Sequence, residues 1–591
     1  MIESLQYPFD VATILRKKKS LKRELLLRKP SYKINIAILG GSTTSEIKNI
    51  LELFLLKAGF LPEFYESEYN KFYEDAVFPN TALESFKPDV IYVHTSNINI
   101  TRFPSFGEGE KEIAELLNNE IKKFQSIWNG LKKYNCLIIQ NNFDLLVNRS
   151  LGNLDFYDIH GKTNFINQLN LLMAQATRES KTLFINDINY LSASMGLKQW
   201  YDRSLWHTAK YAVSFEAIPE LANNITNILN ASLSKNKKCL VLDLDNTCWG
   251  GVIGDEGVNG IGLGNETATG ESFLYFQNYV AELKQRGIIL AVCSKNDHEN
   301  AKEGFTHSDS VLKFEDFTVF KANWEPKHQN IEAIANEINI GLDSLVFIDD
   351  NAVERNIVSS QIPSVSVPDV GNDVIAFVDH IEKNGFFETV SLSKDDIERN
   401  NFYKGNENRV NEQSLFDNYG DFLLSLGMQA EIKPFSPLYI DRITQLINKT
   451  NQFNLTTRRY TVAEVEEVMT NNTYITLYGK LVDKFGDNGL IAIVVANIKG
   501  ASCYIDLWLM SCRVLKRDME FAMLDTLVEK CLAQGVTEII GYYYKTPKNN
   551  MVADLYETFG FSLVEKEGEN SVWKISLENY IVKNQFIKID K

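Results

Sequence analysis

The sequence contains little cysteine and no excess of basic charge, and both features exclude classes of protein. Only seven of its 591 residues are cysteines, and no two of them form a C-x-x-C pair. An odd, scattered set argues against a disulfide framework and against a zinc site, and it predicts a reducing compartment, the cytoplasm. With 61 Lys and Arg against 77 Asp and Glu, the net charge is −16. This charge argues against a general nucleic-acid binder, which needs a basic face to displace phosphate counterions.

Long apolar runs are also missing. No run approaches the roughly 20 apolar residues of a membrane helix, so we expect no membrane span. The opening segment, MIESLQYPFD, has no basic stretch followed by an apolar one, so we expect no secretory signal. The 44% hydrophobic and 23% charged shares are those of an ordinary globular protein. At roughly 100–200 residues per domain, a chain of this length is expected to have about three or four domains.

Short apolar runs alternate with longer amphipathic ones along most of the chain. We place domains at 1–232, 233–390 and 414–591, with a charged segment at 391–413 that we expect to be a helical linker. The expected strands of the first two domains are the apolar runs 34–39, 90–94, 136–140, 182–185, 239–243, 288–293, 319–320 and 344–348. This rhythm predicts parallel sheets wrapped by helices.

The third domain is richer in strand-like runs. They lie at 474–477, 490–498, 503–509 and 538–544, with one helical stretch at 520–533. Consecutive strands with a single long helix between the last two predict an α+β domain. The chain as a whole is therefore predicted to be a multidomain α/β protein.

Carboxylates follow two of the apolar runs in the second domain. Asp243 and Asp245 come after one run, and Asp349 and Asp350 after another. In α/β folds, ligands bind at the carboxyl ends of the strands. Carboxylates placed there suit a nucleophile and an acid or base with a cation between them. The alternative for any one of them is a helix cap at a strand–helix junction.

Two further side chains supply the remaining parts of a phosphoryl-transfer site. Ser294 ends the run 288–293 with a hydroxyl that can bind a phosphoryl oxygen, and Lys327 adds a positive charge. A cation together with Lys327 can neutralise the equatorial oxygens of the transition state. Only about 51 residues separate Asp243 from Ser294, which leaves no room for a large cap domain. The glycine-rich stretch 249–257 is expected to form a β-hairpin flap instead.

The ordered set Asp243-x-Asp245-x-Thr247, Ser294, Lys327 and Asp349-Asp350 resembles the four motifs of the haloacid dehalogenase (HAD) phosphotransferase superfamily. The resemblance implies a Rossmann-like parallel sheet without a large cap. Asp243 would be the nucleophile that forms an aspartyl-phosphate. Asp245 would protonate the leaving group and then activate water, and Thr247 would orient Asp245.

The same resemblance implies the residues that hold phosphate and metal. Ser294 and Lys327 would hold the transferring phosphoryl group. The implied cofactor is Mg²⁺, and its ligands would be Asp243, Asp245 through its backbone carbonyl, Asp349 and Asp350.

Segments between and beyond the motifs are similar to one branch of this superfamily, the FkbH-like family. They include WGGVIGDEGVNGIGLG, GLDSLVFIDDNAVERNIV, LINKTNQFNLTTRRYT and DLWLMSCRVLKRDME. The resemblance implies an enzyme that dephosphorylates 1,3-bisphosphoglycerate and loads a glyceryl-type unit on a separate acyl carrier protein, in secondary-metabolite or polyketide-type biosynthesis. One alternative is a phosphatase with a fused acyltransferase acting on sugar or other precursors of surface polysaccharides. A non-enzymatic scaffold is the other alternative.

Cys512 is our candidate acyl-carrying thiol. It follows a strand-like run and precedes a helix, with Arg513 and Arg517 close by in sequence. Nearby positive charge would favour the thiolate and an anionic substrate. The alternative is a buried small hydrophobe, which is the commonest fate of a free cysteine. Cys293 is the second candidate, although strand alternation points it away from the Ser294 side.

The C-terminal stretch is similar to the GNAT acyltransferase fold in its strand order and in the closing LYETFGF. Its turn at 513–518 has no glycine to cradle a pyrophosphate, so we expect the pantetheine arm of a carrier protein rather than acetyl-CoA. We expect substrate binding by polar groups on two segments of this domain: Asn451, Asn454, Thr456, Arg458 and Arg513. The alternative for the first four is a solvated helix end and turn.

The N-terminal stretch resembles a degenerate SGNH-hydrolase or flavodoxin-like domain. Ser42 ends the first expected strand, and Asp202 and His207 resemble a stretched Asp-x-x-His. A Ser/Asp/His set in this order can perform ester chemistry. The altered spacing favours a docking or structural role as the alternative.

Overall fold

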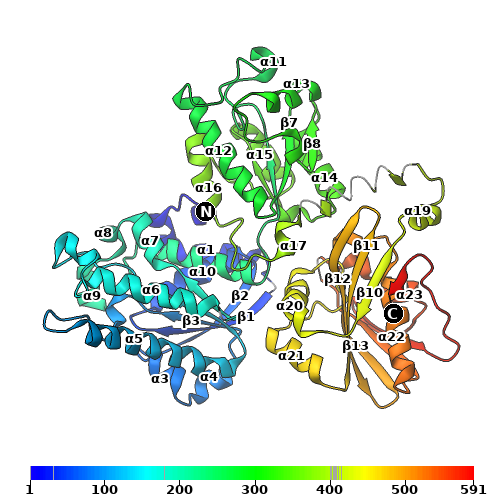
Figure 1. The fold of residues 1–591 in the computed structure, drawn as a ribbon, viewed down its shortest axis with the longest axis horizontal. Helices are drawn as coiled ribbons and strands as arrows, with labels where there is room; N and C mark the ends of the chain where they lie inside the picture. Colours follow the sequence, from blue (N-terminus) through cyan, green and yellow to red (C-terminus); the bar gives the residue numbers. More distant parts are fainter. Residues whose placement is uncertain are drawn as a thin grey trace. The chain divides into compact units, whose positions relative to one another are not determined.

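The computed structural model describes residues 2–30, 32–178, 180–399, 402–403, 409, 412–413, 415–546 and 548–590. These residues form three β-sheets in two compact units (Figure 1). The first unit comprises residues 1–232 and 382–390, and the second comprises 233–381 and 391–591. The prediction of a multidomain α/β protein is confirmed, whereas the bounds of the separate domains stay a prediction.

The first unit is built on a parallel sheet in the order β2-β1-β3-β4-β5. The strands are β1 (Tyr32–Gly40), β2 (Phe60–Glu66), β3 (Val90–His94), β4 (Leu137–Asn141) and β5 (Leu183–Asn186). Residues of α5 (Glu110–Leu131) and α6 (Lys162–Arg178) share a core with alternate residues of β1 and β3. Successive β1 residues are buried, as expected for a parallel sheet covered on both faces.

Residues 382–390 pack with the first unit rather than with the segment that precedes them. The side-chain amide of Asn223 donates to the carbonyl of Lys383 at 2.8 Å, and the N–H of Tyr7 donates to the side chain of Asn384 at 2.9 Å. Gly385 has a φ of +66°, and a Cβ there would lie 2.0 Å from the Asn227 amide. Glycine at this position therefore permits the close approach.

A second parallel sheet, in the order β8-β7-β6-β9, lies within the second unit. Its strands are β6 (Cys239–Leu242), β7 (Ile289–Ser294), β8 (Val319–Ala322) and β9 (Leu345–Ile348). Every residue of β6, β7 and β9 is buried. Side chains of α14 (Lys327–Glu337) and α15 (Ala352–Gln361) contribute to the core on one face. The sheet has parallel register throughout, so the carboxyl ends of its strands meet at one edge.

The third sheet is mixed and follows the order β15-β16-β14-β13-β12-β11-β10-β17. Its strands are β10 (Gln429–Lys433), β11 (Tyr474–Asp483), β12 (Gly486–Lys499), β13 (Ser502–Met510), β14 (Glu538–Tyr543), β15 (Ser562–Glu567), β16 (Asn570–Ser576) and β17 (Lys588–Asp590). Strands β10 to β13 are antiparallel neighbours, whereas β13 and β14 are parallel. Helix α22 (Met519–Ala533) connects that parallel pair, as such a pair requires.

A short segment fills the place where β13 and β14 diverge. The two strands pair only as far as Ile505 with Gly541. Beyond that point, residues 453–455 supply the missing backbone partners. The N–H of Leu455 donates to Trp508 O at 3.0 Å, and the N–H of Met510 donates to Phe453 O at 3.0 Å. On the other side, the N–H of Tyr544 donates to Leu455 O at 2.9 Å.

One local expectation needs correction. The glycine-rich segment is not a β-hairpin: Gly250 and Gly262 form a single antiparallel bridge, and the short helix α11 (Ile253–Glu256) lies between them. The N–H of Ile253 donates to Asp245 at 3.1 Å, which draws the chain toward the sheet edge instead of letting it pair with itself. In the expected helical linker, α17 (Lys394–Ile397) is present, and most of residues 400–414 lie outside the described part.

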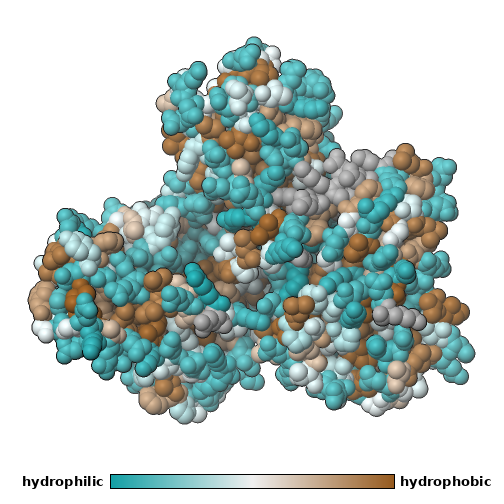
Figure 2. Space-filling model, in the orientation of Figure 1, coloured by the Kyte–Doolittle hydropathy of each residue, from teal (hydrophilic) through white to brown (hydrophobic). Residues whose placement is uncertain are grey.

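The described helices include none that is both long and apolar enough to cross a membrane. On the face shown in Figure 2, hydrophobic residues form small patches among hydrophilic ones. Scattered apolar surface of this kind is normal for a folded protein.

Candidate active site

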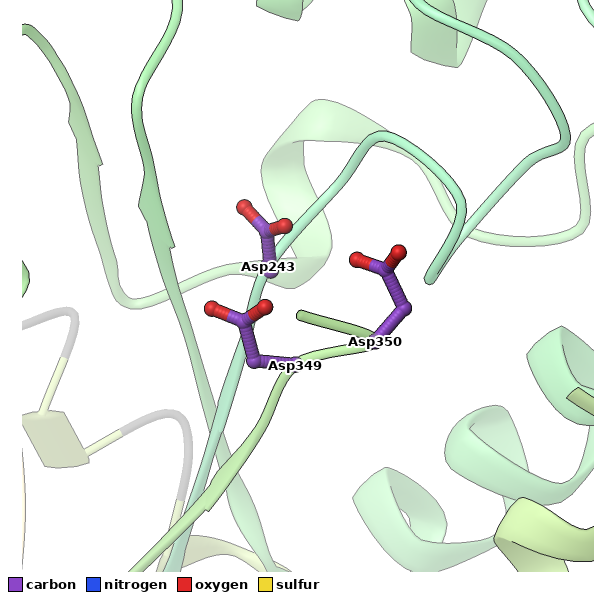
Figure 3. A group of neighbouring side chains, drawn as sticks. All are labelled: Asp243, Asp349 and Asp350. Carbon is purple, nitrogen blue, oxygen red and sulfur yellow. The ribbon is translucent and has the colours of Figure 1, made fainter. Parts of the chain in front are cut away.

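Three carboxylates meet at the carboxyl edge of the sheet β8-β7-β6-β9 (Figure 3). Asp243 directly follows β6, and Asp349 and Asp350 directly follow the neighbouring strand β9. Oxygen atoms of the three side chains all lie within 4.8 Å of one another. Asp243 and Asp349 are buried, and Asp350 is partly exposed. The structure therefore brings together three of the four predicted metal ligands through their side chains.

Lys327 lies against this group and pairs with two of its members. Its Nζ lies 2.9 Å from Asp243 Oδ1 and 2.6 Å from Asp349 Oδ2. The ammonium is 3% exposed. Burial works against its charge, but the two carboxylates outweigh burial and raise the pKa of Lys327 above its usual value. Lys327 is therefore a fixed positive charge at the edge of the carboxylate group.

The surroundings of Asp349 and Asp350 raise the pKa values of both carboxyl groups when no cation is present. Burial, and then repulsion by Asp243, raise the pKa of Asp349 to about 6, against the attraction of Lys327. The pKa of Asp350 is raised by the same two causes, burial first. Carboxylates crowded in this way are relieved by a bound cation. The donor set of three closely spaced carboxylate oxygens is thus chemically suited to a hard divalent ion.

The loop after β9 is held by groups outside the predicted set. Arg355 is buried and donates to the backbone carbonyls of Asp349 and Asp350 at 2.8 and 2.7 Å. We expected Thr247 to orient Asp245, but its hydroxyl instead accepts the N–H of Asp350 at 3.3 Å. The carboxylate of Asp245 is bonded instead to Trp249, Ile253 and Asn296. Thr247 therefore positions the Asp350 loop.

Asp245 is held by three donors. Its Oδ1 accepts from the indole of Trp249 at 2.9 Å and from the N–H of Ile253 at 3.1 Å. Its Oδ2 accepts from Asn296 at 3.0 Å. Burial raises the pKa of Asp245, although these hydrogen bonds oppose the shift. A carboxyl with a raised pKa suits a general acid.

Sequence reasoning missed Trp249, Asn296 and Arg355 as residues that position the site. Trp249 and Asn296 stand close in sequence to Asp245 and Ser294, and that proximity is the only sequence signal for them. Ser294 is buried and ends β7 beside β6, at the expected edge of the sheet, and its phosphate-binding role stays a prediction.

Cys293 is not a reactive thiol in this structure. It is fully buried in the core, and its Sγ donates to Lys327 O at 3.5 Å. Burial raises its pKa well above the usual value of a thiol. A neutral buried thiol is a poor nucleophile, so the second candidate for acyl transfer is corrected to a core residue.

Cys512 begins a short 3-10 helix (Cys512–Val514) after β13, and its side chain lies outside the described part of the structure. Its expected basic neighbour Arg517 is instead buried against Asp483 and donates to it at 2.9 Å. Arg409 donates to the same carboxylate at 2.9 and 2.7 Å. The guanidinium of Arg513 lies 4.5 Å from the ring centre of Phe402. Arg517 thus stabilises the turn after β13, and it shares one buried carboxylate with Arg409.

The four side chains of the 451–458 segment that we expected to bind substrate all contact other groups of the protein. Asn454 is fully buried and donates to Thr450 O at 3.1 Å, while its Oδ1 accepts the N–H of Thr457 at 2.8 Å. Thr456 donates to Asp506 O at 2.8 Å. Both side chains bond to backbone groups, and the expectation that Asn454 and Thr456 bind substrate stays a prediction. The other two, Asn451 and Arg458, contact Arg459 and Asp506 respectively.

The structure does not give the three residues of the predicted Ser/Asp/His set the same exposure: Ser42 is buried, whereas Asp202 and His207 are exposed. Ser42 is buried after β1, and its Oγ has no hydrogen-bond partner among the described residues. Asp202 caps α9 (Arg203–Ala209) and accepts the N–H groups of Ser204 and Leu205. His207 is exposed on the same helix. The described hydrogen bonds do not join Ser42 to either residue.

Sequence reasoning also missed a buried polar chain in this sheet. Nδ1 of His94 lies 2.8 Å from Tyr92 Oη and 3.1 Å from Asn141 Nδ2. Asn186 donates to Asn141 at 2.7 Å, and Asn224 donates to Asn186 at 2.6 Å. Burial lowers the pKa of His94 to about 4, so it is neutral at pH 7.

Comparisons with known proteins agree with this architecture. A model of the family described as "FkbH, N-terminal domain" matches residues 35–230. The crystal structure of the N-terminal part of the protein BF1531 from Bacteroides fragilis, which contains a phosphatase domain and is complexed with Mg, is 32% identical. The match covers 63% of this chain and 99% of that one, with a TM-score of 0.59. No protein with a curated description matches.

Two matches to acetyltransferases are much weaker. The ribosomal-protein-S18-alanine N-acetyltransferase from Escherichia coli is 10% identical over 26% of this chain and 99% of that one, with a TM-score of 0.20. The GNAT domain of S. lividans PAT is 12% identical over 24% of this chain and 89% of that one, with a TM-score of 0.21. No conclusion follows from similarity at this level.

The parallel sheet, the ordered carboxylates and the lysine at its edge define a HAD-type phosphatase domain. The chain belongs to the FkbH family. It is accordingly an enzyme.

Proposed function

We propose that this protein is a Mg²⁺-dependent phosphatase and acyltransferase that dephosphorylates a unit derived from 1,3-bisphosphoglycerate and loads a glyceryl-type group on a separate acyl carrier protein. The observation that carries the phosphatase part is the contact of Lys327 with both Asp243 and Asp349 beside Asp350. This arrangement supports a nucleophile, a cation site and a positive charge that act together in phosphoryl transfer.

Mg²⁺ fits the residues present, because three carboxylates converge at one point and burial and crowding raise the pKa of two of them, Asp349 and Asp350. Asp243, Asp349 and Asp350 would hold the ion through their side chains, with the backbone carbonyl of Asp245 as a further ligand. When bound, Mg²⁺ supplies charge neutralisation for the phosphoryl oxygens. The phosphatase relative from Bacteroides fragilis, complexed with Mg, supports this assignment.

The residues divide the reaction into two displacements. A carboxylate oxygen of Asp243 attacks phosphorus, the bond to the leaving oxygen breaks, and Asp245 gives that oxygen its proton. Asp245 then takes a proton from water, the water oxygen attacks phosphorus, and the bond to Asp243 breaks to release inorganic phosphate. Lys327 and Ser294 hold the phosphoryl oxygens during both steps.

The acyl part of the proposal concerns the acyl phosphate of 1,3-bisphosphoglycerate. A thiolate attacks its carbonyl carbon, and the carbon–oxygen bond to phosphate breaks, so no ATP is needed. Cys512 is the proposed acceptor thiol, from which the glyceryl-type unit would pass to the carrier thiol. A covalent enzyme thioester divides the transfer into two easier steps.

A phosphatase with a fused acyltransferase that acts on precursors of surface polysaccharides is the second candidate. A carrier assay separates the two. The protein is incubated with 1,3-bisphosphoglycerate, Mg²⁺ and a phosphopantetheinylated carrier protein, and the carrier is weighed. A glyceryl thioester on the carrier supports the first function, whereas phosphate release with an unmodified carrier supports the second.

A further inference from the structure

A cavity of about 580 Å³ opens beside the three carboxylates. Asp350 belongs both to the carboxylate group and to the wall of the cavity, so the two are continuous. The other lining residues come from the loop after β6, the start of α12 (Ala268–Gln285) and the segment before Phe377, and they include Gly250, Gly251, Glu256, Gly262, Phe273 and Asp373. The volume is in the range of small-molecule sites.

Backbone forms much of this wall because glycine is required there. Gly250 and Gly262 exchange two backbone hydrogen bonds, at 3.0 and 2.8 Å. Gly251 has a φ of +87°, and a Cβ on it would lie 2.2 Å from Glu256 Oε1. A side chain at Gly251 would therefore displace the Glu256 carboxylate. Along this stretch the wall offers backbone groups, and Phe273 adds one aromatic side chain.

The charged side chains of the cavity are all acidic. Glu256 and Asp373 are exposed, and Asp350 is the third carboxylate. The lining residues of the described part include no Lys, Arg or His. Glu256 Oε1 accepts the N–H of Val252 at 3.2 Å, and Asp373 accepts the N–H of Ile375 at 3.1 Å, which fixes both carboxylates in place.

Two cations whose charge acts on Asp350 are already engaged by other partners. Lys327 pairs with Asp243 and Asp349. Arg355 donates to backbone carbonyls and to Asp369 at 2.7 Å. A second anionic group in the cavity would therefore meet carboxylates without a matching positive charge. A hydroxyl, in contrast, can donate to the same carboxylates.

We propose that this cavity receives the group esterified to the phosphate, and that Glu256 and Asp373 select an uncharged, hydroxyl-bearing group and repel a second anion. The proposal rests on the phosphatase function and adds the substrate class to it. Like charges repel one another, so removal of these two carboxylate charges should relax the selection against a second anion. The phosphate itself is accommodated separately, beside Lys327.

Two phosphate monoesters of the same size test the proposal. The leaving group of glycerol 3-phosphate is uncharged. In 3-phosphoglycerate, a carboxylate replaces the terminal hydroxymethyl group of that leaving group. We expect the wild-type kcat/KM to be about tenfold higher for glycerol 3-phosphate. The Glu256→Gln/Asp373→Asn double variant removes both charges and should raise kcat/KM for 3-phosphoglycerate about fivefold, so that the ratio of the two kcat/KM values falls from about ten to about two.

Controls separate charge from general effects. The Glu282→Gln/Glu332→Gln variant removes two exposed carboxylates outside the cavity and should leave the preference unchanged. High salt should reduce the wild-type preference, because it screens charges at exposed positions. Equal turnover of both esters by wild type, or a preference that the double variant does not alter, overturns the proposal. Hydrolysis of p-nitrophenyl phosphate is the separate measure of phosphatase function, and its absence would contradict that function and this proposal together.

Discussion

One ammonium group pairs with two buried carboxylates at the centre of the site. Lys327 contacts Asp243 and Asp349 from the first residue of α14, whereas both carboxylates leave from strand ends. The neighbouring positions are fixed by Arg355 and Thr247, which hold the backbone of the Asp350 loop. The geometry of the site thus depends on residues that never touch a substrate.

Replacement of Lys327 should produce a variant whose free energy of unfolding depends on bound Mg²⁺. In Lys327→Met, the buried carboxylates lose their partner, and we expect unfolding free energy to fall by about 3 kcal/mol in chelator. Added Mg²⁺ should recover more stability in the variant than in wild type, as measured by thermal unfolding. The matched control is Lys295→Met, whose partner is the peripheral Glu354. Identical Mg²⁺ responses in both variants would show that Lys327 does not balance the cation site.

His94 makes the first unit sensitive to acid. Its folded pKa, about 4, lies below the value of about 6.5 for an exposed histidine. The unfolded chain therefore binds the proton more readily, and stability is lost as pH falls from about 6.5 towards 4. At pH 5 we expect this residue to cost about 2 kcal/mol relative to pH 7.

The measurement is urea unfolding of wild type and His94→Gln at pH 7 and pH 5. The variant should lose less stability than wild type over that interval, since its side chain does not titrate. The same loss in both proteins would mean that His94 does not contribute to the acid sensitivity.

At the scale of elements, residues 453–455 behave as a short strand inserted between two longer ones. Their backbone hydrogen bonds reach Trp508, Met510 and Tyr544. Asn549, which is also buried, donates to Asn454 O at 2.9 Å and closes the far side. The polar atoms of this segment are thereby committed to the fold of the third sheet.

Proline at one position of this segment should destabilise the third sheet. In Leu455→Pro the bond to Trp508 is lost and the ring meets a packed environment, so we expect a loss of about 3 kcal/mol. Val462→Pro is the matched control, because it places proline at the first position of α21 (Val462–Thr470), where no helical N–H bond is lost. Circular dichroism during thermal unfolding should show a lower transition for the first variant alone. Equal behaviour of the two would contradict the strand-like role of the segment.

Sequence patterns predicted the buried strands well and the exposed ones poorly. The runs predicted at 90–94 and 344–348 correspond to β3 and β9 within a residue, because buried parallel strands are continuously apolar. Strand β15 was not predicted, since all six of its residues are exposed and carry no apolar alternation. Asp243, Lys327 and Asp349 were predicted together from motif order, whereas Asn296 and Arg355 depend on tertiary contacts that the order of residues does not reveal.

At the scale of the whole molecule, the proposal assigns two reactions to different groups in one chain. Phosphate removal belongs to Asp243 and its neighbours, and acyl transfer is proposed for Cys512. The acidic cavity adds a constraint on the first reaction. A phosphoglyceryl group whose carboxyl has become a thioester carries no anion besides its phosphate ester, so the acidic cavity accepts it. Free 1,3-bisphosphoglycerate carries a second phosphate, which the cavity would repel.

Cys512→Ala should separate the two reactions. Without the thiol, we expect loading of the carrier protein to fall by at least about a hundredfold, while Mg²⁺-dependent release of phosphate from p-nitrophenyl phosphate stays within about twofold. Intact mass measurement of wild type after exposure to the acyl phosphate should show an adduct that hydroxylamine removes. Full carrier loading by the variant would exclude a covalent step at Cys512 and favour direct transfer to the carrier thiol.

The central claim is that Asp243 is the nucleophile of a Mg²⁺-dependent phosphatase, and phosphate release by Asp243→Asn tests it most directly. The amide keeps the shape of the side chain but is a poor nucleophile and removes one charge from the cation site. We predict that wild type hydrolyses p-nitrophenyl phosphate only with Mg²⁺, and that the variant, folded as judged by circular dichroism, is slower by at least about a thousandfold. Turnover by Asp243→Asn at the wild-type rate would contradict the account.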